Sequence, residues 1–85
     1  MLFRSAVRFV NAEVVGYRPY SFTGSDGKII DMVQVFATYD DNRVQGYASC
    51  AFNVSNNKFL DNGIALGKEV KIIFAEKRWQ YVGTV

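Results

Sequence analysis

Hydrophobic and polar residues alternate almost without interruption between residues 43 and 54. Successive side chains of a β-strand point to opposite faces, so this pattern predicts a strand with one buried and one exposed face. The predicted core positions are Val44, Gly46, Ala48, Cys50, Phe52 and Val54. The predicted outer positions are Arg43, Gln45, Tyr47, Ser49, Ala51 and Asn53. This outer row has no carboxylate, so it is suited to an anionic ligand with flat rings, and single-stranded nucleic acid is the leading candidate.

Four more extended segments are predicted at residues 2–20, 29–39, 69–75 and 79–85. The first is expected to bend or bulge near Asn11 and Gly16. Pro19 cannot donate a ladder hydrogen bond, so its stretch should lie at a sheet edge or in a protruding hairpin. One row of side chains is expected to share a face there: Val14, Gly16, Arg18, Tyr20 and Phe22.

Turn residues separate these segments. Asp26 and Gly27 predict a turn at residues 23–28, because Asp bonds the local backbone and Gly accepts positive φ. Residues 40–42 predict a tight hairpin, and residues 76–78 predict another turn. Residues 55–63 break the alternation and predict one helical turn capped by Ser55 or Asn56, with Phe59 and Leu60 filling the core.

This order predicts an all-β fold: a five-stranded OB-type small barrel with one short helix between the third and fourth strands. Closing the sheet would remove exposed edges that favour aggregation. An SH3-like barrel is the alternative, although the insertion at residues 55–63 argues against it. The whole chain, residues 1–85, is expected to form one OB-like nucleic-acid-binding domain.

Composition narrows the choice of function. The longest apolar run, residues 72–75, is far shorter than the ~20 residues of a membrane span. The N-terminus lacks the apolar core of a signal peptide, so a cytoplasmic or intraviral location is expected. A single cysteine, Cys50, fits a reducing compartment, and the absence of His excludes Cys/His zinc sites and His-dependent triads.

No motif predicts an enzyme. Residues 24–28 superficially resemble a phosphate-binding loop, but the glycines are three apart and no Ser or Thr follows Lys28. The aspartates do not match calcium-loop spacing, and no general base accompanies a nucleophile. We therefore expect no catalytic residue, metal, cofactor or small-molecule substrate.

Basic and aromatic residues are interleaved at three places in the chain. Nonspecific binding of single strands requires cations along the phosphates and rings against the bases. The predicted nucleic-acid-binding residues are Arg18, Tyr20, Phe22, Lys28, Arg43, Gln45, Tyr47, Lys71, Lys77, Arg78 and Trp79. Tyr20, Tyr47 and Trp79 are expected to stack with bases. Phe22, Trp79 and Tyr81 can instead belong to the core, because small barrels are rich in aromatic residues.

Four segments carry a family resemblance, at residues 15–22, 24–28, 33–36 and 44–47. Together they resemble the small single-stranded-DNA-binding proteins of phages and Gram-positive mobile elements, which are similar to the filamentous-phage helix-destabilising proteins. The resemblance implies an OB-type barrel, a homodimer and cooperative coating of replication or transfer intermediates. It also implies that the hairpin at residues 20–28 contacts DNA.

Two other functions remain open. Met32, Phe36 and Ile73 are apolar residues at predicted outer positions, so a protein-interaction module or a dimer interface is possible. Single-stranded RNA is the third possibility, because phosphate contacts and base stacking serve both polymers.

Overall fold

The computed structural model describes residues 8–85 and contains five strands and one short helix. The elements are β1 (Arg8–Thr23), β2 (Ile29–Tyr39), β3 (Ala48–Ser55), α1 (Asn56–Asp61), β4 (Glu69–Ala75) and β5 (Arg78–Thr84). This confirms the all-β class and the helix between the third and fourth strands. The predicted first strand also included residues 2–7, which lie outside the described residues.

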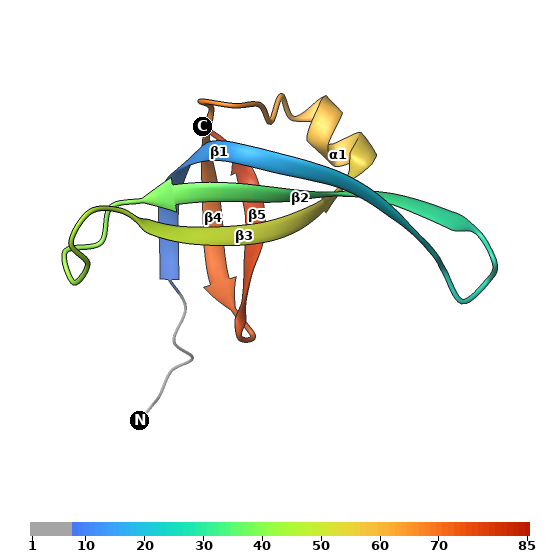
Figure 1. The fold of residues 1–85 in the computed structure, drawn as a ribbon, viewed down its shortest axis with the longest axis horizontal. Coiled ribbons are helices and arrows are strands. Elements are labelled where there is room, and N and C mark those ends of the chain that lie inside the picture. The colour runs from blue at the N-terminus through green and yellow to red at the C-terminus, as the bar shows by residue number, and fades with distance from the viewer. Residues whose placement is uncertain (1–7) are drawn as a thin grey trace.

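The strands form one antiparallel sheet in the order β3-β2-β1-β4-β5. The long strand β1 pairs with β4 through its first half and with β2 through its second half. The β4–β5 pair therefore crosses behind the β1–β2–β3 layer (Figure 1). The two edge strands, β3 and β5, contact each other, but no ladder joins them within residues 8–85.

The core lies between these two layers, and its β3 residues follow the alternation predicted for the second half of the 43–54 segment. It contains Ala12, Val14, Val33, Val35, Ala37, Tyr39, Cys50, Phe52, Val54, Ile64, Val70 and Ile72. Phe59, Trp79 and Tyr81 pack against it while remaining partly exposed. The prediction that Leu60 fills the core is wrong, because its side chain is 65% exposed on α1. A helix of six residues presents only one side to the sheet.

A β-bulge changes the direction of the side chains in β1. Val14 lies opposite Ala37, whereas Gly16 lies opposite Phe36, so the extra residue Val15 shifts the register by one. The bulge near Gly16 is confirmed, and the pairing near Asn11 is regular. The row predicted from residue 14 to residue 22 is therefore wrong at its start. Val14 points into the core, and the outward row begins at Gly16.

The second half of β1 and the first half of β2 form a hairpin that extends beyond the rest of the sheet (Figure 1). Pro19 lies in the part of β1 that pairs with β2 alone, which confirms its edge position. The predicted turn is also confirmed. Gly27 has φ +83°, and the Lys28 backbone N–H donates to Asp26 Oδ1 at 3.0 Å.

The predicted start of the third strand is wrong. Residues 40–47 form a loop, and β3 begins only at Ala48. The turn is tightened by the Val44 N–H, which donates to the Asp41 carbonyl at 2.9 Å, and Gly46 adopts φ +87°. That backbone conformation is incompatible with a strand. The prediction that Val44 and Gly46 lie in the core is therefore wrong, because both are exposed in the loop.

Candidate nucleic-acid interface

The outward side chains of the second half of β1, of β2 and of β3 form one continuous surface. Residues directly opposite each other in antiparallel strands share a face, which defines its members. This hairpin face comprises Gly16, Arg18, Tyr20, Phe22, Ile30, Met32, Gln34, Phe36, Thr38, Ser49, Ala51, Asn53 and Ser55. None of these residues is acidic, but Glu13 of β1 lies directly opposite Thr38 and places a carboxylate at that end of the face. The expected combination of rings, amides and a cation therefore exists on three strands rather than on β3 alone, and the part around Arg18, Tyr20 and Phe22 has no carboxylate.

Arg18, Tyr20 and Phe22 form an ordered row on β1. The guanidinium carbon of Arg18 lies 5.5 Å from the Tyr20 ring centroid, and its Nη2 donates to Gln34 Oε1 at 2.8 Å. The Tyr20 and Phe22 centroids are 6.4 Å apart, with 24° between the ring planes. These contacts hold a cation and two rings in a fixed order along the hairpin. Phe22 is the more open of the two rings, being 47% exposed.

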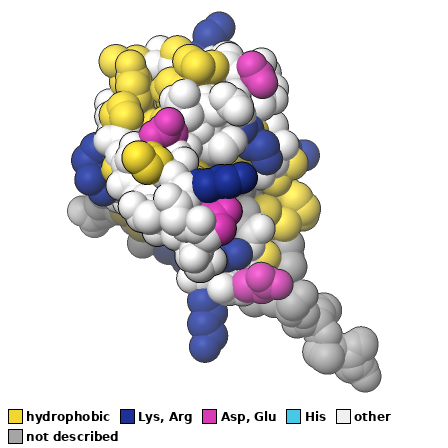
Figure 2. Space-filling model, turned by 90° about the vertical axis from the view of Figure 1, so that its right-hand side faces the viewer, with side chains coloured by type: hydrophobic (Ala, Val, Ile, Leu, Met, Phe, Trp, Pro, Cys, Tyr) yellow, Lys and Arg dark blue, Asp and Glu magenta, His cyan; other side chains and the backbone are white. Residues whose placement is uncertain are grey.

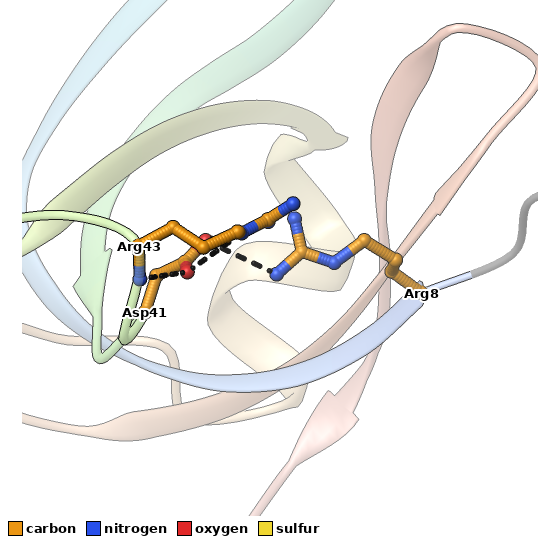
Figure 3. A network of polar contacts seen from close by, with 3 residues as sticks. All are labelled: Arg8, Asp41 and Arg43. Carbon is orange, nitrogen blue, oxygen red and sulfur yellow. Dashed lines mark hydrogen bonds and ion pairs between the residues drawn. The ribbon is translucent and has the colours of Figure 1, made fainter.

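Arg43 does not belong to this surface. Asp41 Oδ1 accepts hydrogen bonds from the Arg43 backbone N–H and Nε, both at 3.0 Å, and Oδ2 accepts one from Arg43 Nη2 at 2.8 Å. Arg8 Nη2 of β1 approaches the same Oδ2 at 3.4 Å (Figure 3). Asp41 thus joins the 40–47 loop to β1 and compensates part of the positive charge.

The environment of Asp41 strongly favours its ionised form. Hydrogen bonds from the side chain and backbone of Arg43, and the charges of Arg43 and Arg8, hold the pKa of the Asp41 carboxyl far below its usual range. Its side chain is only 7% exposed. The prediction that Arg43 lies on a face free of carboxylates is therefore wrong.

Gln45 and Tyr47 lie in the same loop and are exposed, Tyr47 by 71%. Tyr47 lines a hollow with three carboxylates, those of Glu13, Asp40 and Glu69. Glu13 and Glu69 are directly opposite each other on β1 and β4, so acidic residues also lie within the sheet. These carboxylates repel phosphate groups, so the surface around Tyr47 is poorly suited to binding a nucleic-acid backbone.

The remaining predicted residues are dispersed over the molecule. Lys28 is exposed just beyond the hairpin turn, next to the hairpin face. Lys71 lies on β4 with its Nζ 5.4 Å from the Phe9 ring, away from the hairpin face. Lys77 occupies the β4–β5 turn, and the exposed Arg78 begins β5. Figure 2 accordingly shows dark blue and magenta side chains interspersed on the side it displays.

Trp79 has two roles in the structure. Its ring packs against Phe74 at 5.1 Å and against Tyr39 at 5.5 Å between centroids, so it supports the core. It is still partly exposed and lines a groove between β3 and β5. We call this the β3–β5 groove; it holds about 470 Å³. Its lining residues are Met32, Asn53, Val54, Ser55, Lys58, Arg78, Trp79, Gln80 and Tyr81.

Several residues of these two surfaces were not predicted as site residues. Gln34 and Asn53 occupy outward positions of the alternating pattern, so the sequence could have predicted that they lie on this face. Lys58 had no such signal, because it reaches the groove from α1. Gln80 reaches it only because β5 lies close to β3.

Two further observations bear on the class of protein. No helix in residues 8–85 is long and apolar enough to span a membrane. The same residues hold no group of three or more His, Cys, Asp or Glu side chains placed to bind a metal. No protein-family model matches the chain, and comparison with curated proteins and with solved structures found no match either.

Proposed function

We propose that this chain is a sequence-nonspecific single-stranded-DNA-binding protein that binds through the hairpin face and coats replication or transfer intermediates. The observation that carries the proposal is the composition of that face: Arg18, Tyr20 and Phe22 in a row, amides beside them, and no carboxylate directly opposite this row. Rings stack with any base, and a cation attracts any phosphate, so this surface needs no particular sequence.

The fold supports the same proposal by analogy. We propose that the sheet is an OB-type barrel in which β3 and β5 approach without pairing. OB-folds bind oligonucleotides through strands 2 and 3 and through the loops joining strands 1–2 and 4–5. Here those parts are the hairpin face, the turn that precedes Lys28, and the turn that contains Lys77. Binding, rather than catalysis, is the proposed activity.

The test is a titration of the protein with labelled oligo-dT and with duplex DNA of equal length. We expect oligo-dT to bind much more tightly, with a log–log salt slope of about −0.7 for each phosphate contact. Phe22→Ala should weaken binding roughly 5- to 150-fold, since a stacked base contributes ~1–3 kcal/mol.

Phe9→Ala is the matched control. Phe9 is 59% exposed on the same strand, but it lies opposite Ile73 of β4, outside the hairpin face. It should therefore leave binding to oligo-dT unchanged. Equal losses in both variants, or no binding to oligo-dT at low salt, would refute the proposal. Competition with an RNA oligomer of matched sequence will identify the preferred polymer.

Exposed apolar residues of the same face favour one alternative, a protein-binding or dimer surface. Phe22, Ile30 and Phe36 are all exposed there. Binding of a protein partner or a second copy through these side chains should change little between low and high salt, because it depends on apolar burial. Sedimentation of the free protein at both salt concentrations measures this.

A further inference from the structure

The β3–β5 groove has rigid aromatic walls. Trp79 and Tyr81 of β5 line it and are backed by the core. The Tyr81 ring is stacked on the buried Phe52, with centroids 5.8 Å apart and 16° between planes. The Tyr81 hydroxyl is also within 2.6 Å of Thr84 Oγ1. These supports hold both rings in place before anything binds, so little conformational freedom would be lost on binding.

The charge of the groove is positive. Lys58 of α1 and Arg78 of β5 line it, and neither forms a salt bridge with another residue between 8 and 85. No acidic residue is among the nine lining residues. The groove therefore complements an anion, and its aromatic walls complement a flat ring.

Two side-chain amides add hydrogen-bonding groups. Asn53 Oδ1 accepts from the Tyr20 hydroxyl, and Gln80 Nε2 donates to the Ala75 carbonyl at 3.3 Å. Within residues 8–85 these bonds leave Asn53 Nδ2 as an unused donor and Gln80 Oε1 as an unused acceptor. The edge of every nucleobase presents donors or acceptors that such amides can pair with.

The groove is continuous with the hairpin face, because Met32, Asn53 and Ser55 belong to both. We propose that a single strand crossing the hairpin face turns one base into the β3–β5 groove. The base packs against Trp79 and Tyr81, and its phosphate lies between Lys58 and Arg78. This inference rests on the proposed function and adds a reason for strand selectivity. A base in a duplex is paired and stacked, and it must leave the helix to enter such a groove.

The experiment compares oligo-dT with an abasic deoxyribose-phosphate oligomer of the same length, using the intact protein. Binding is followed by the anisotropy of a label on the oligomer and by the fluorescence of Trp79, which is the only tryptophan of the chain. We expect oligo-dT to quench Trp79 and to bind at least tenfold more tightly than the abasic oligomer. The abasic oligomer should leave the fluorescence unchanged.

Lys58→Glu tests the phosphate contact. Its side chain is exposed, and the helix caps use only its backbone: the N–H donates to Ser55 Oγ at 3.1 Å, and the carbonyl accepts from Asn62. Lys68→Glu is the matched control, since Lys68 is exposed in the loop before β4 and lines neither surface. We expect Lys58→Glu to lower the affinity for oligo-dT by tenfold or more and Lys68→Glu by less than threefold.

The outcomes separate the two proposals. If oligo-dT binds more tightly than the abasic oligomer but Trp79 does not respond, the groove proposal is wrong while DNA binding by the hairpin face stands. An equal effect of Lys58→Glu and Lys68→Glu would likewise overturn the phosphate contact in the groove. If neither oligomer binds at low salt, the proposed function itself is wrong, and the groove proposal with it.

Discussion

The Tyr20 hydroxyl of β1 donates a hydrogen bond to Asn53 Oδ1 of β3 at 3.0 Å, across the intervening strand β2. The two residues are 33 positions apart in the chain. The bond fixes the Tyr20 ring over the centre of the hairpin face, with Arg18 above it at 5.5 Å. It also orients the Asn53 amide at the entrance to the β3–β5 groove. One hydrogen bond thus connects the two surfaces proposed to bind DNA.

Tyr20→Phe and Asn53→Ala should each lower the free energy of unfolding by about 0.5–1 kcal/mol, the usual net value of one hydrogen bond. The double variant should lose less than the sum of the single losses, because both substitutions remove the same bond. Chemical denaturation of the four proteins measures this. Additive losses would show that the bond contributes nothing to stability.

Asp41→Asn should release the 40–47 loop from β1, since the Asn side chain cannot compensate Arg8 and Arg43. We expect faster amide hydrogen exchange in residues 40–47 and unchanged exchange in β2. Asp40→Asn is the matched control, because Asp40 is an exposed neighbour that forms no salt bridge within the described part of the chain. Equal exchange in the two variants would contradict this role of Asp41.

The same ion pairs predict an acid-dependent loop. The pKa of Asp41 is lowered in the folded protein, so its contribution to stability is complete above about pH 4, the ordinary Asp pKa. It decreases as the pH falls below that value. Exchange of the loop amides should therefore accelerate, after correction for intrinsic rates, below pH 4 in the natural protein and not in Asp41→Asn.

Cys50 should be unreactive while the protein is folded. Burial raises the pKa of its thiol to about 11, and its Sγ donates to the Ala37 carbonyl at 3.6 Å. The neutral thiol is favoured in the folded state, so its contribution to stability is present below about pH 8.5, the unfolded value. That contribution should decline between pH 8.5 and 11. A thiol reagent at pH 8 should label the protein only after denaturant is added, and rapid labelling of the native protein would contradict the burial.

The β4–β5 turn offers a stabilising change. Glu76 and Lys77 adopt φ +55° and +67°, which side chains other than Gly and Asn tolerate poorly. Asn-Gly is the preferred pair for a two-residue turn of this kind. Glu76→Asn combined with Lys77→Gly should raise the free energy of unfolding by about 1 kcal/mol. Thermal and chemical denaturation measure the gain, and a loss of stability would show that the turn is not strained.

Local chemistry determined much of the fold in advance. The period-two pattern placed Cys50, Phe52 and Val54 in the core, because every strand must point alternate side chains to opposite faces. The Asp26–Gly27 turn and the Ser55 cap also follow from short-range hydrogen bonds and backbone preferences. Such features depend only on residues a few positions apart.

The extent of that alternation was misleading at residues 43–47. Val44 and Gly46 fit the alternating pattern. However, Asp41 forms ion pairs with its neighbour Arg43 and with Arg8 of β1, which is 33 positions away from Asp41. These ion pairs stabilise a loop where the first residues of the strand were predicted. The Arg8–Asp41 pair depends on the path of β1, which a local sequence pattern does not contain.

The sequence by itself determined which residues alternate, where the hairpin turns and where the helix begins, since neighbouring residues decide those features. Only the tertiary structure decided which side chains meet: the bulge at Val14–Gly16 turned Arg18, Tyr20 and Phe22 outward. The packing of β5 near β3 also brought Trp79 and Arg78 into the same groove as Asn53. The physical reason is that a groove between two edge strands depends on the twist and crossing of the whole sheet, to which every strand contributes.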